Sequence, residues 1–122
     1  MGKYALKVNE KGARFNLVAG NGEIIGVSEQ YTSDSAAKNG IESVRKNAVI
    51  AEIEDQTTPT VEAKKNPKFE IYKDKAGEFR FRLKAANGEP ILASEGYTSK
   101  AGCKNGIDSV RRNADSEIVK VD

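Results

Sequence analysis

The sequence predicts an α+β fold in which two tandem β-β-β-α-β repeats form a single antiparallel sheet with both helices on one face. First, residues 14–48 recur as residues 80–114, with 22 of the 35 aligned positions identical. Second, apolar residues in each repeat alternate with a period of two and then recur with a period near 3.6. Third, one repeat alone is near the size at which a core becomes marginal, which favours a shared core and a pseudo-two-fold arrangement.

Three strands are expected at the start of the first repeat. Residues 4–9 and 13–19 alternate apolar and polar side chains, as half-buried strands do. A third strand is expected over residues 23–29. Asn21-Gly22 precedes it and favours a type I′ hairpin turn, in which both central residues have positive φ. Asn87-Gly88 predicts the same turn in the second repeat.

A helix and a last strand complete each repeat. The helix is indicated by an apolar stripe of four residues, which are Ala37, Ile41, Val44 and Ala48 in the first repeat and Cys103, Ile107, Val110 and Ala114 in the second. Thr32-Ser33 and Thr98-Ser99 supply candidate N-caps. Asn47 and Asn113 are candidate left-handed C-caps. The last strands are expected over 49–53 and 117–121.

The repeats divide the chain into three segments. We expect repeat one over residues 1–54, a linker over 55–67 and repeat two over 68–122, all within one compact domain. The linker is polar, contains Pro59 and Pro67, and lacks periodicity.

The second repeat carries the motifs FEIYKD, FRFRLKAANGE, SEGYTSK and CKNGIDSVRRNA. Together they resemble the YegP-like family of small bacterial proteins, which often consist of two tandem copies of a domain of unknown function. The resemblance implies that the two units form one sheet and exchange their C-terminal strands. It implies no activity and no catalytic residue.

Composition excludes several kinds of site. The chain has no histidine, which removes His-dependent nucleophiles and Cys/His zinc sites. Cys103 is the only cysteine and lies in the helix stripe, so a small buried residue and a reducing, cytoplasmic location are the plain interpretation. No apolar run approaches the roughly 18 residues of a membrane span. We expect no catalytic residue, no metal site, no cofactor and no membrane partner.

Two repeated motifs leave alternatives open. Gly40 and Gly106 lie inside the predicted helices, where glycine costs about 1 kcal/mol relative to alanine. Close packing is the favoured explanation, and backbone access for a ligand is the other. The motif Glu-x-Tyr-Thr-Ser before each helix is compatible with an anion site or with a simple helix cap.

One strand of the second repeat carries alternating basic residues. The candidate ligand or nucleic-acid face comprises Tyr72, Arg80, Arg82 and Lys84, with Arg14 at the equivalent place in the first repeat. Basic groups beside an aromatic ring on an open sheet are typical of single-stranded nucleic-acid platforms. Glu70 and Glu78 are expected nearby, where they would pair with these charges, and an ordinary solvated strand face is the alternative.

These features favour a small, monomeric, non-enzymatic binding or protein-interaction module. A protein partner is expected through an edge strand or the open sheet face. The alternative is a single-stranded nucleic-acid-binding module that uses the basic face, although the net charge of +2 is too small to indicate nucleic acid by itself.

Overall fold

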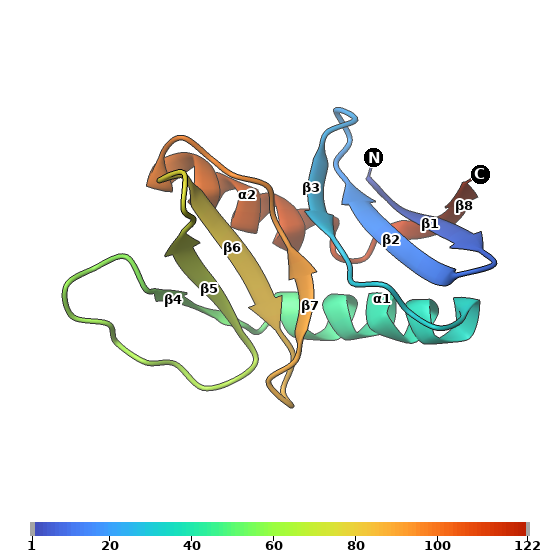
Figure 1. The fold of residues 1–122 in the computed structure, drawn as a ribbon, viewed down its shortest axis with the longest axis horizontal. Helices are drawn as coiled ribbons and strands as arrows, with labels where there is room; N and C mark the ends of the chain where they lie inside the picture. Colours follow the sequence, from blue (N-terminus) through green and yellow to red (C-terminus); the bar gives the residue numbers. More distant parts are fainter. Residues whose placement is uncertain (1, 122) are drawn as a thin grey trace.

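A computed structural model describes residues 2–121, and within them one sheet of eight strands packs against two helices (Figure 1). The first repeat contains β1 (Lys3–Asn9), β2 (Gly12–Val18), β3 (Ile24–Val27), α1 (Asp34–Ala48) and β4 (Glu52–Asp55). The second contains β5 (Lys68–Lys73), β6 (Phe79–Lys84), β7 (Pro90–Ala93), α2 (Lys100–Asn113) and β8 (Glu117–Val121).

Equivalent strands of the two repeats follow in the same order from either end of the sheet. It runs β4-β5-β6-β7-β3-β2-β1-β8, so the third strands of the two repeats meet at the centre through Val27 and Ala93. This order has the pseudo-two-fold arrangement that the repeat predicts.

The last strand of each repeat lies in the half of the sheet that the other repeat forms. β8 pairs with β1, and β4 pairs with β5. Figure 1 shows α1 running across the molecule, from the side of β1 and β2 toward β4 and β5. The strand exchange implied by the family resemblance is therefore confirmed.

The sheet is mixed, so the expectation of a wholly antiparallel sheet is wrong for its two edges. The six central strands pair with one another in antiparallel fashion, whereas β8–β1 and β4–β5 are parallel pairs. Each last strand follows a helix instead of a hairpin turn, and a helical crossover is the connection that parallel pairing needs.

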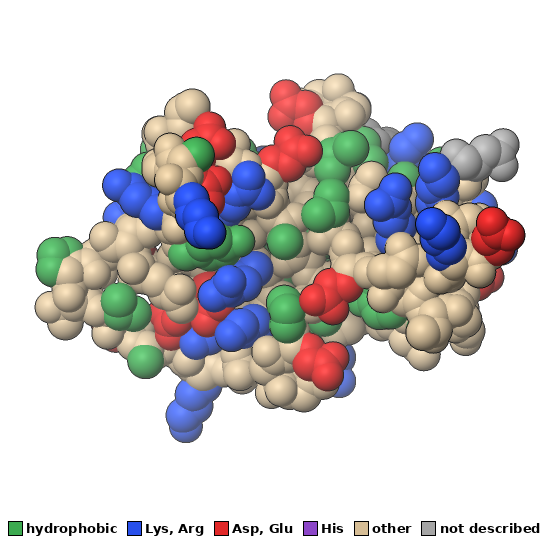
Figure 2. All heavy atoms as spheres, viewed as in Figure 1, with side chains coloured by type: hydrophobic (Ala, Val, Ile, Leu, Met, Phe, Trp, Pro, Cys, Tyr) green, Lys and Arg blue, Asp and Glu red, His purple; other side chains and the backbone are tan. Residues whose placement is uncertain are grey.

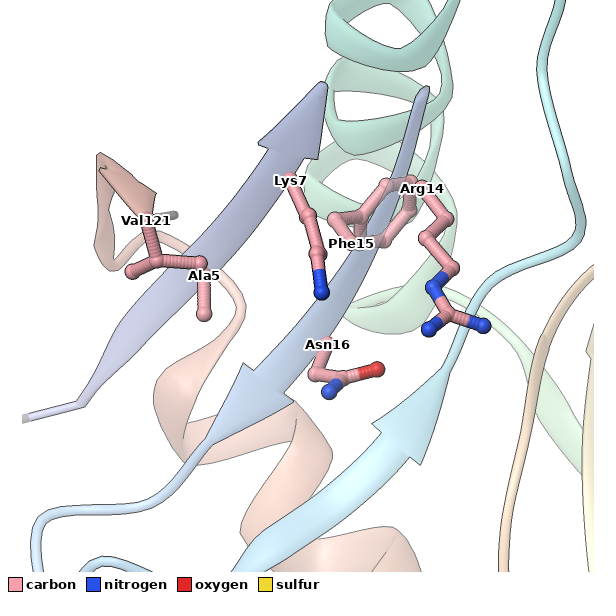
Figure 3. Close-up of a pocket in the computed structure, with 6 residues that line it drawn as sticks. All are labelled: Ala5, Lys7, Arg14, Phe15, Asn16 and Val121. Carbon is pink, nitrogen blue, oxygen red and sulfur yellow. The ribbon is translucent and has the colours of Figure 1, made fainter. Parts of the chain in front are cut away.

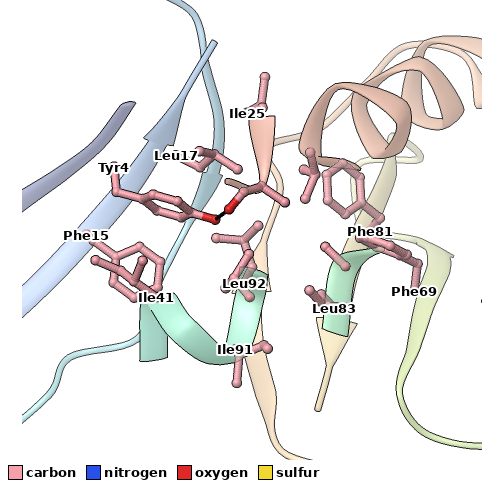
Figure 4. Close-up of a cluster of buried hydrophobic side chains, with 14 of the residues drawn as sticks. Tyr4, Phe15, Leu17, Ile25, Ile41, Phe69, Phe81, Leu83, Ile91 and Leu92 are labelled. Atoms are coloured by element: carbon pink, nitrogen blue, oxygen red, sulfur yellow. Dashed lines mark hydrogen bonds between the residues drawn. The ribbon is translucent and has the colours of Figure 1, made fainter. Parts of the chain in front are cut away.

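One continuous core lies between the sheet and the helices (Figure 4). Alternate residues of the inner strands enter it, among them Phe15, Leu17, Phe81 and Leu83. Ile41 of α1 and Ile107 of α2 are fully buried, as the helix stripes predict. This packing leaves the opposite face of the sheet open to solvent.

The helices begin as expected and end differently. Ser33 and Ser99 are the N-caps, and each hydroxyl accepts a backbone N–H at 3.0 Å. The prediction of left-handed C-caps at Asn47 and Asn113 is wrong, because no described residue other than glycine has a positive φ. Both Asn side chains instead donate to a carbonyl one turn earlier, at 2.8 Å.

The last strand of the first repeat begins later in the chain than predicted. Residues 49–51 form a turn, in which the N–H groups of Ile50 and Ala51 donate to the carbonyl of Asn47. β4 starts only at Glu52. Apolar residues at 49 and 50 suggested a buried strand, but both are exposed.

The hairpin turns form where predicted with a different geometry. Of the two central residues in each turn, only the glycine, Gly22 or Gly88, has a positive φ. The turns are therefore not type I′. The side chains of Asn21 and Asn87 instead accept the N–H two residues ahead, at 3.0 Å in each turn. The strand register shifts beside both turns, which is the bulge that longer hairpin loops introduce.

Close packing explains the helix glycines. A methyl group at Gly40 would overlap the hydroxyl of Tyr31, and one at Gly106 would overlap the hydroxyl of Tyr97. The favoured interpretation, in which the helix approaches its neighbours too closely for a side chain, is confirmed.

Candidate functional site

The open face of the sheet carries two groups of basic residues with different surroundings. Figure 2 shows Lys and Arg side chains gathered over β1 and β2, and others interspersed with acidic side chains over β5 and β6. We call the surface around Lys7 and Arg14 the first-half face. The surface around Tyr72, Arg80, Arg82 and Lys84 is the second-half face.

The second-half face brings together four of the five residues that the sequence proposed. Tyr72, Arg80, Arg82 and Lys84 lie on β5 and β6, and strand pairing places Tyr72 directly opposite Arg80. The Arg82 guanidinium stacks 4.5 Å from the centre of the Tyr72 ring. The fifth residue, Arg14, lies on β2 in the other half.

Glu70 neutralises much of this face. Its carboxylate accepts a hydrogen bond from Arg82 and also lies 3.4 Å from the Lys84 ammonium and 3.3 Å from that of Lys68. Burial by itself would raise the pKa of Glu70, but the Arg82 and Lys68 hydrogen bonds outweigh burial and lower it. The expectation that Glu70 pairs with the basic residues is therefore confirmed.

Asp74, and not Glu78, pairs with Arg80. The Asp74 carboxylate accepts a hydrogen bond from Arg80 at 2.7 Å, which lowers its pKa. The same side chain also accepts two backbone N–H groups in its turn, at 2.9 and 3.0 Å. Glu78 lies against Gly96 instead, so its predicted role is wrong.

A second buried carboxylate reaches this face from the exchanged strand. Glu54 of β4 pairs with Lys68 at 2.9 Å and accepts the N–H of Lys64 at 2.8 Å. Hydrogen bonds from Gln56, Lys68 and Lys64 lower the pKa of Glu54 to about 2. Sequence reasoning missed Glu54 because its position depends on the strand exchange.

The first-half face has basic residues without these carboxylates. Lys7 and Arg14 are direct neighbours across β1 and β2. Ala5 stands where the second half has Glu70, because Ala5 lies two residues before Lys7 in β1 and Glu70 lies two residues before Tyr72 in β5. None of the ion pairs formed among residues 2–121 involves Lys7 or Arg14.

A hollow of about 250 Å³ lies at this position (Figure 3). It is lined by Ala5, Lys7, Arg14, Phe15, Asn16 and Val121. In Figure 3 the Lys7 ammonium and the Arg14 guanidinium lie on the same side of the strands as the Asn16 amide. Ala5 contributes only a methyl group to the lining, and β8 pairs with β1 beside it. No local sequence pattern indicates this hollow, because Val121 reaches it from the other repeat.

A family model described as a domain of unknown function, DUF1508, matches residues 9–55 and again residues 74–120. The chain belongs to this family. The two matches correspond to the two repeats, and the DUF1508 description assigns no activity to either.

Two bacterial relatives match the chain over different lengths. The UPF0339 protein YegP of Yersinia pestis is 42% identical over 121 residues, which are 98% of this chain and 95% of that protein. The UPF0339 protein in the ptx operon 5′ region of Stutzerimonas stutzeri is 74% identical over 46 residues. That match covers 38% of this chain and 41% of that relative.

A solved member has the same fold. The solution structure of yegP from E. coli, described as a protein of unknown function, matches with a TM-score of 0.79 and 33% identity. The match covers 98% of this chain and 91% of the E. coli chain. None of these names assigns a catalytic activity to a DUF1508 protein.

The remaining candidate groups have structural roles. Cys103 is buried, and burial together with the Asp55 carboxylate raises the pKa of its thiol to about 11. The thiol is therefore protonated at neutral pH and a poor nucleophile.

Among residues 2–121 no three Asp, Glu or Cys side chains lie close enough to hold a metal ion. Neither helix is long and apolar enough to cross a membrane.

Proposed function

We propose that this chain is a non-enzymatic binding module whose first-half face takes an acidic, extended segment of another protein. The observation that carries the proposal is the pair Lys7 and Arg14, which lie side by side at a hollow that no Asp or Glu side chain among residues 2–121 lines. Like charges directly opposite on paired strands are unfavourable, so a carboxylate from a partner would relieve a repulsion that the folded chain leaves in place.

The edge of the sheet supports a protein segment as the ligand. β8 is the last strand of the sheet beside this face, and Val121 of β8 lines the hollow. An extended peptide that adds to β8 by backbone hydrogen bonds would place alternate side chains toward the open face. Because β8 lies between such a peptide and β1, its carboxylates would extend across β8 toward Lys7, which is the nearer cation, and then Arg14.

The opposite edge is less accessible to such a segment. Beyond β4, the linker folds back so that the Lys64 N–H bonds to Glu54. Together with the buried carboxylates of Glu54 and Glu70, this makes the second-half face less attractive to an acidic ligand.

Single-stranded nucleic acid is the second candidate ligand. The observation that favours it is the Tyr72 ring stacked with Arg82 on the second-half face, where a base could also stack. Phosphates would have to compete there with Glu70 for Arg82 and Lys84, and with Asp74 for Arg80. The protein segment is the stronger candidate because no ion pair formed among residues 2–121 competes for Lys7 or Arg14.

Binding measurements with matched variants test the proposal. The probe is a fluorescein-labelled peptide that alternates Glu with Thr, compared with the same peptide carrying Gln in place of Glu. We expect Lys7→Ala with Arg14→Ala to weaken binding of the Glu peptide by about tenfold, and Arg80→Ala with Arg82→Ala to change it less than about twofold. Equal losses in both variants, or equal binding of the two peptides, would overturn the proposal.

The same variants distinguish the second candidate. A labelled single-stranded oligonucleotide that binds through the second-half face should lose affinity with Arg80→Ala and Arg82→Ala. Its affinity should also fall steeply as salt rises, because phosphate contacts release counterions.

A further inference from the structure

The two halves of the sheet hold equivalent ion pairs of opposite polarity. Asp34 is the first residue of α1, directly after the Ser33 cap, and Lys100 holds the same place in α2 after Ser99. The Lys120 ammonium lies 3.2 Å from the Asp34 carboxylate. The Lys100 ammonium lies 2.8 Å from the carboxylate of Asp55.

The strand residues of these pairs are equivalent too. In β8, Lys120 pairs with Leu6 of β1, while in β4 Asp55 pairs with Ile71 of β5. Leu6 and Ile71 hold matching places in the two hairpins, opposite Phe15 and Phe81. The helix residue is thus acidic and the strand residue basic in the first half, and the reverse holds in the second half.

A second contact holds the start of each exchanged strand, and it does not depend on the side chains of that strand. Arg45 of α1 donates to the backbone carbonyl of Ser116, and Arg111 of α2 donates to that of Ala51, each at 2.6 Å. Because both arginines bind backbone, either anchor would accept either strand. Of these contacts, only the charged pairs distinguish the two strands.

We propose that the charge-reversed pairs direct each exchanged strand to the other repeat, and so disfavour a dimer in which two copies pair like repeats with each other. If two copies paired like repeats with each other, Asp55 of one copy would approach Asp34 of the second. Lys120 would likewise approach Lys100. Both contacts would bring like charges together, whereas assembly within one chain satisfies all four groups.

The groups are charged under ordinary conditions. Burial would raise the pKa of Asp55, but hydrogen bonds from Lys100 and Thr57 lower it to about 2. The pKa of Asp34 is also lowered, since Lys120 and Lys38 outweigh the effect of burial. The selection therefore operates at neutral pH, and salt should weaken it because the pairs are partly exposed.

Three full-length variants with unchanged composition and net charge test the proposal. The helix variant combines Asp34→Lys with Lys100→Asp, and the strand variant combines Asp55→Lys with Lys120→Asp. Each places like charges together within one chain and opposite charges together between two copies. The full-reversal variant carries all four substitutions and restores opposite charges within one chain.

The measurement is the oligomeric state after refolding at high protein concentration, determined by size-exclusion chromatography with light scattering. An exposed pair is worth about threefold in an equilibrium constant, and a like-charge contact costs a similar factor. In the helix and strand variants each edge of the monomer exchanges an opposite-charge pair for a like-charge contact, which is a change of about ninefold. Over both edges we therefore expect the ratio of dimer to monomer to rise by at least about a hundredfold. The original chain and the full-reversal variant should stay monomeric, and high salt should narrow the difference.

Several outcomes would overturn the proposal. They are an original chain that dimerises as readily as the helix and strand variants, helix and strand variants that remain monomeric, and a full-reversal variant that dimerises as readily as they do. If the helix and strand variants fail to fold, the full-reversal variant still decides, because it contains every substitution that they contain. Recovery of a folded monomer then supports charge matching, and an unfolded or aggregated product contradicts it. Exchange of the exposed turn residues Glu10 and Lys11, which form no ion pair among residues 2–121, is the matched control.

Discussion

The hydroxyl of Tyr4 in β1 donates a hydrogen bond of 2.6 Å to the carbonyl of Ala114, which directly follows α2 (Figure 4). The bond joins the first strand of one repeat to the end of the helix of the other. Tyr4 is fully buried, and burial raises the pKa of its hydroxyl, which therefore remains a donor. Phe69 holds the equivalent place in the second half and has no hydroxyl to donate.

Removal of this hydroxyl should weaken the joint between the repeats. Tyr4→Phe leaves the Ala114 carbonyl buried without its partner, so we expect the free energy of unfolding to fall by about 1–2 kcal/mol. Tyr72→Phe is the matched control, because Tyr72 is partly exposed and should change stability by less than about 0.5 kcal/mol. Urea unfolding of both variants measures the difference, and equal stability of the two would contradict the assigned role.

The close approach of α2 to Tyr97 should make the protein sensitive to a larger residue at position 106. Gly106→Ala should lower the free energy of unfolding by about 2 kcal/mol, because the overlap with the Tyr97 hydroxyl exceeds the gain in helix propensity. Gly102→Ala in the same helix is the control, since its new methyl group would lie 3.2 Å from the Ser99 hydroxyl and no closer than 3.5 Å to Tyr97. We expect that change to stay within about 1 kcal/mol. Thermal unfolding of both proteins provides the comparison.

Much of the fold follows from local patterns, and the pairing at the edges does not. Alternation around Phe15 and Phe81 and the stripes around Ile41 and Ile107 are enough to predict three strands and a helix in each repeat. No local pattern specifies that β8 pairs with β1. That pairing is parallel and lies between repeats, and only the family resemblance indicated the exchange.

Local patterns likewise predict only part of the two candidate faces. Strand alternation predicts that Arg80, Arg82 and Glu70 share one face, because all three lie within a single hairpin. The contributions of Glu54 and Val121 arise from exchanged strands, so a reading of each repeat alone misses them. The change from Glu70 to Ala5 between the halves is visible in the sequence only once the strand register is known.

Glu70 should be the residue that keeps the second-half face from binding anions. Glu70→Gln removes a buried carboxylate from Arg82, Lys84 and Lys68, so we expect the affinity for a single-stranded oligonucleotide to rise on the order of tenfold. Stability should fall by about 2 kcal/mol because the cations lose their partner. Glu10→Gln removes an exposed carboxylate and serves as the control in the same anisotropy and unfolding measurements.

Acid should destabilise the protein through the exchanged strand β4. The pKa values of Glu54 and Asp55 are both about 2 in the folded chain, below their ordinary values of 4.5 and 3.8. The unfolded chain therefore binds more protons between about pH 5 and pH 2, so the free energy of unfolding falls as the pH decreases through that range. We expect a loss of up to about 3 kcal/mol from these groups.

A variant isolates the Glu54 contribution to acid sensitivity. Glu54→Gln should be less stable at neutral pH and should lose less stability between pH 5 and pH 2 than the original chain. Urea unfolding at several pH values measures both slopes. Parallel slopes in the two proteins would show that Glu54 does not contribute.

The central functional claim is that the first-half face is the binding surface. The most direct test is an amide NMR titration of the full chain with the unlabelled peptide that alternates Glu and Thr. We expect shifts that cluster in β1, β2 and β8 around Lys7, Arg14 and Val121, and that disappear with Lys7→Ala and Arg14→Ala. Shifts that cluster in β5 and β6, or an unchanged spectrum at saturating peptide, would contradict it.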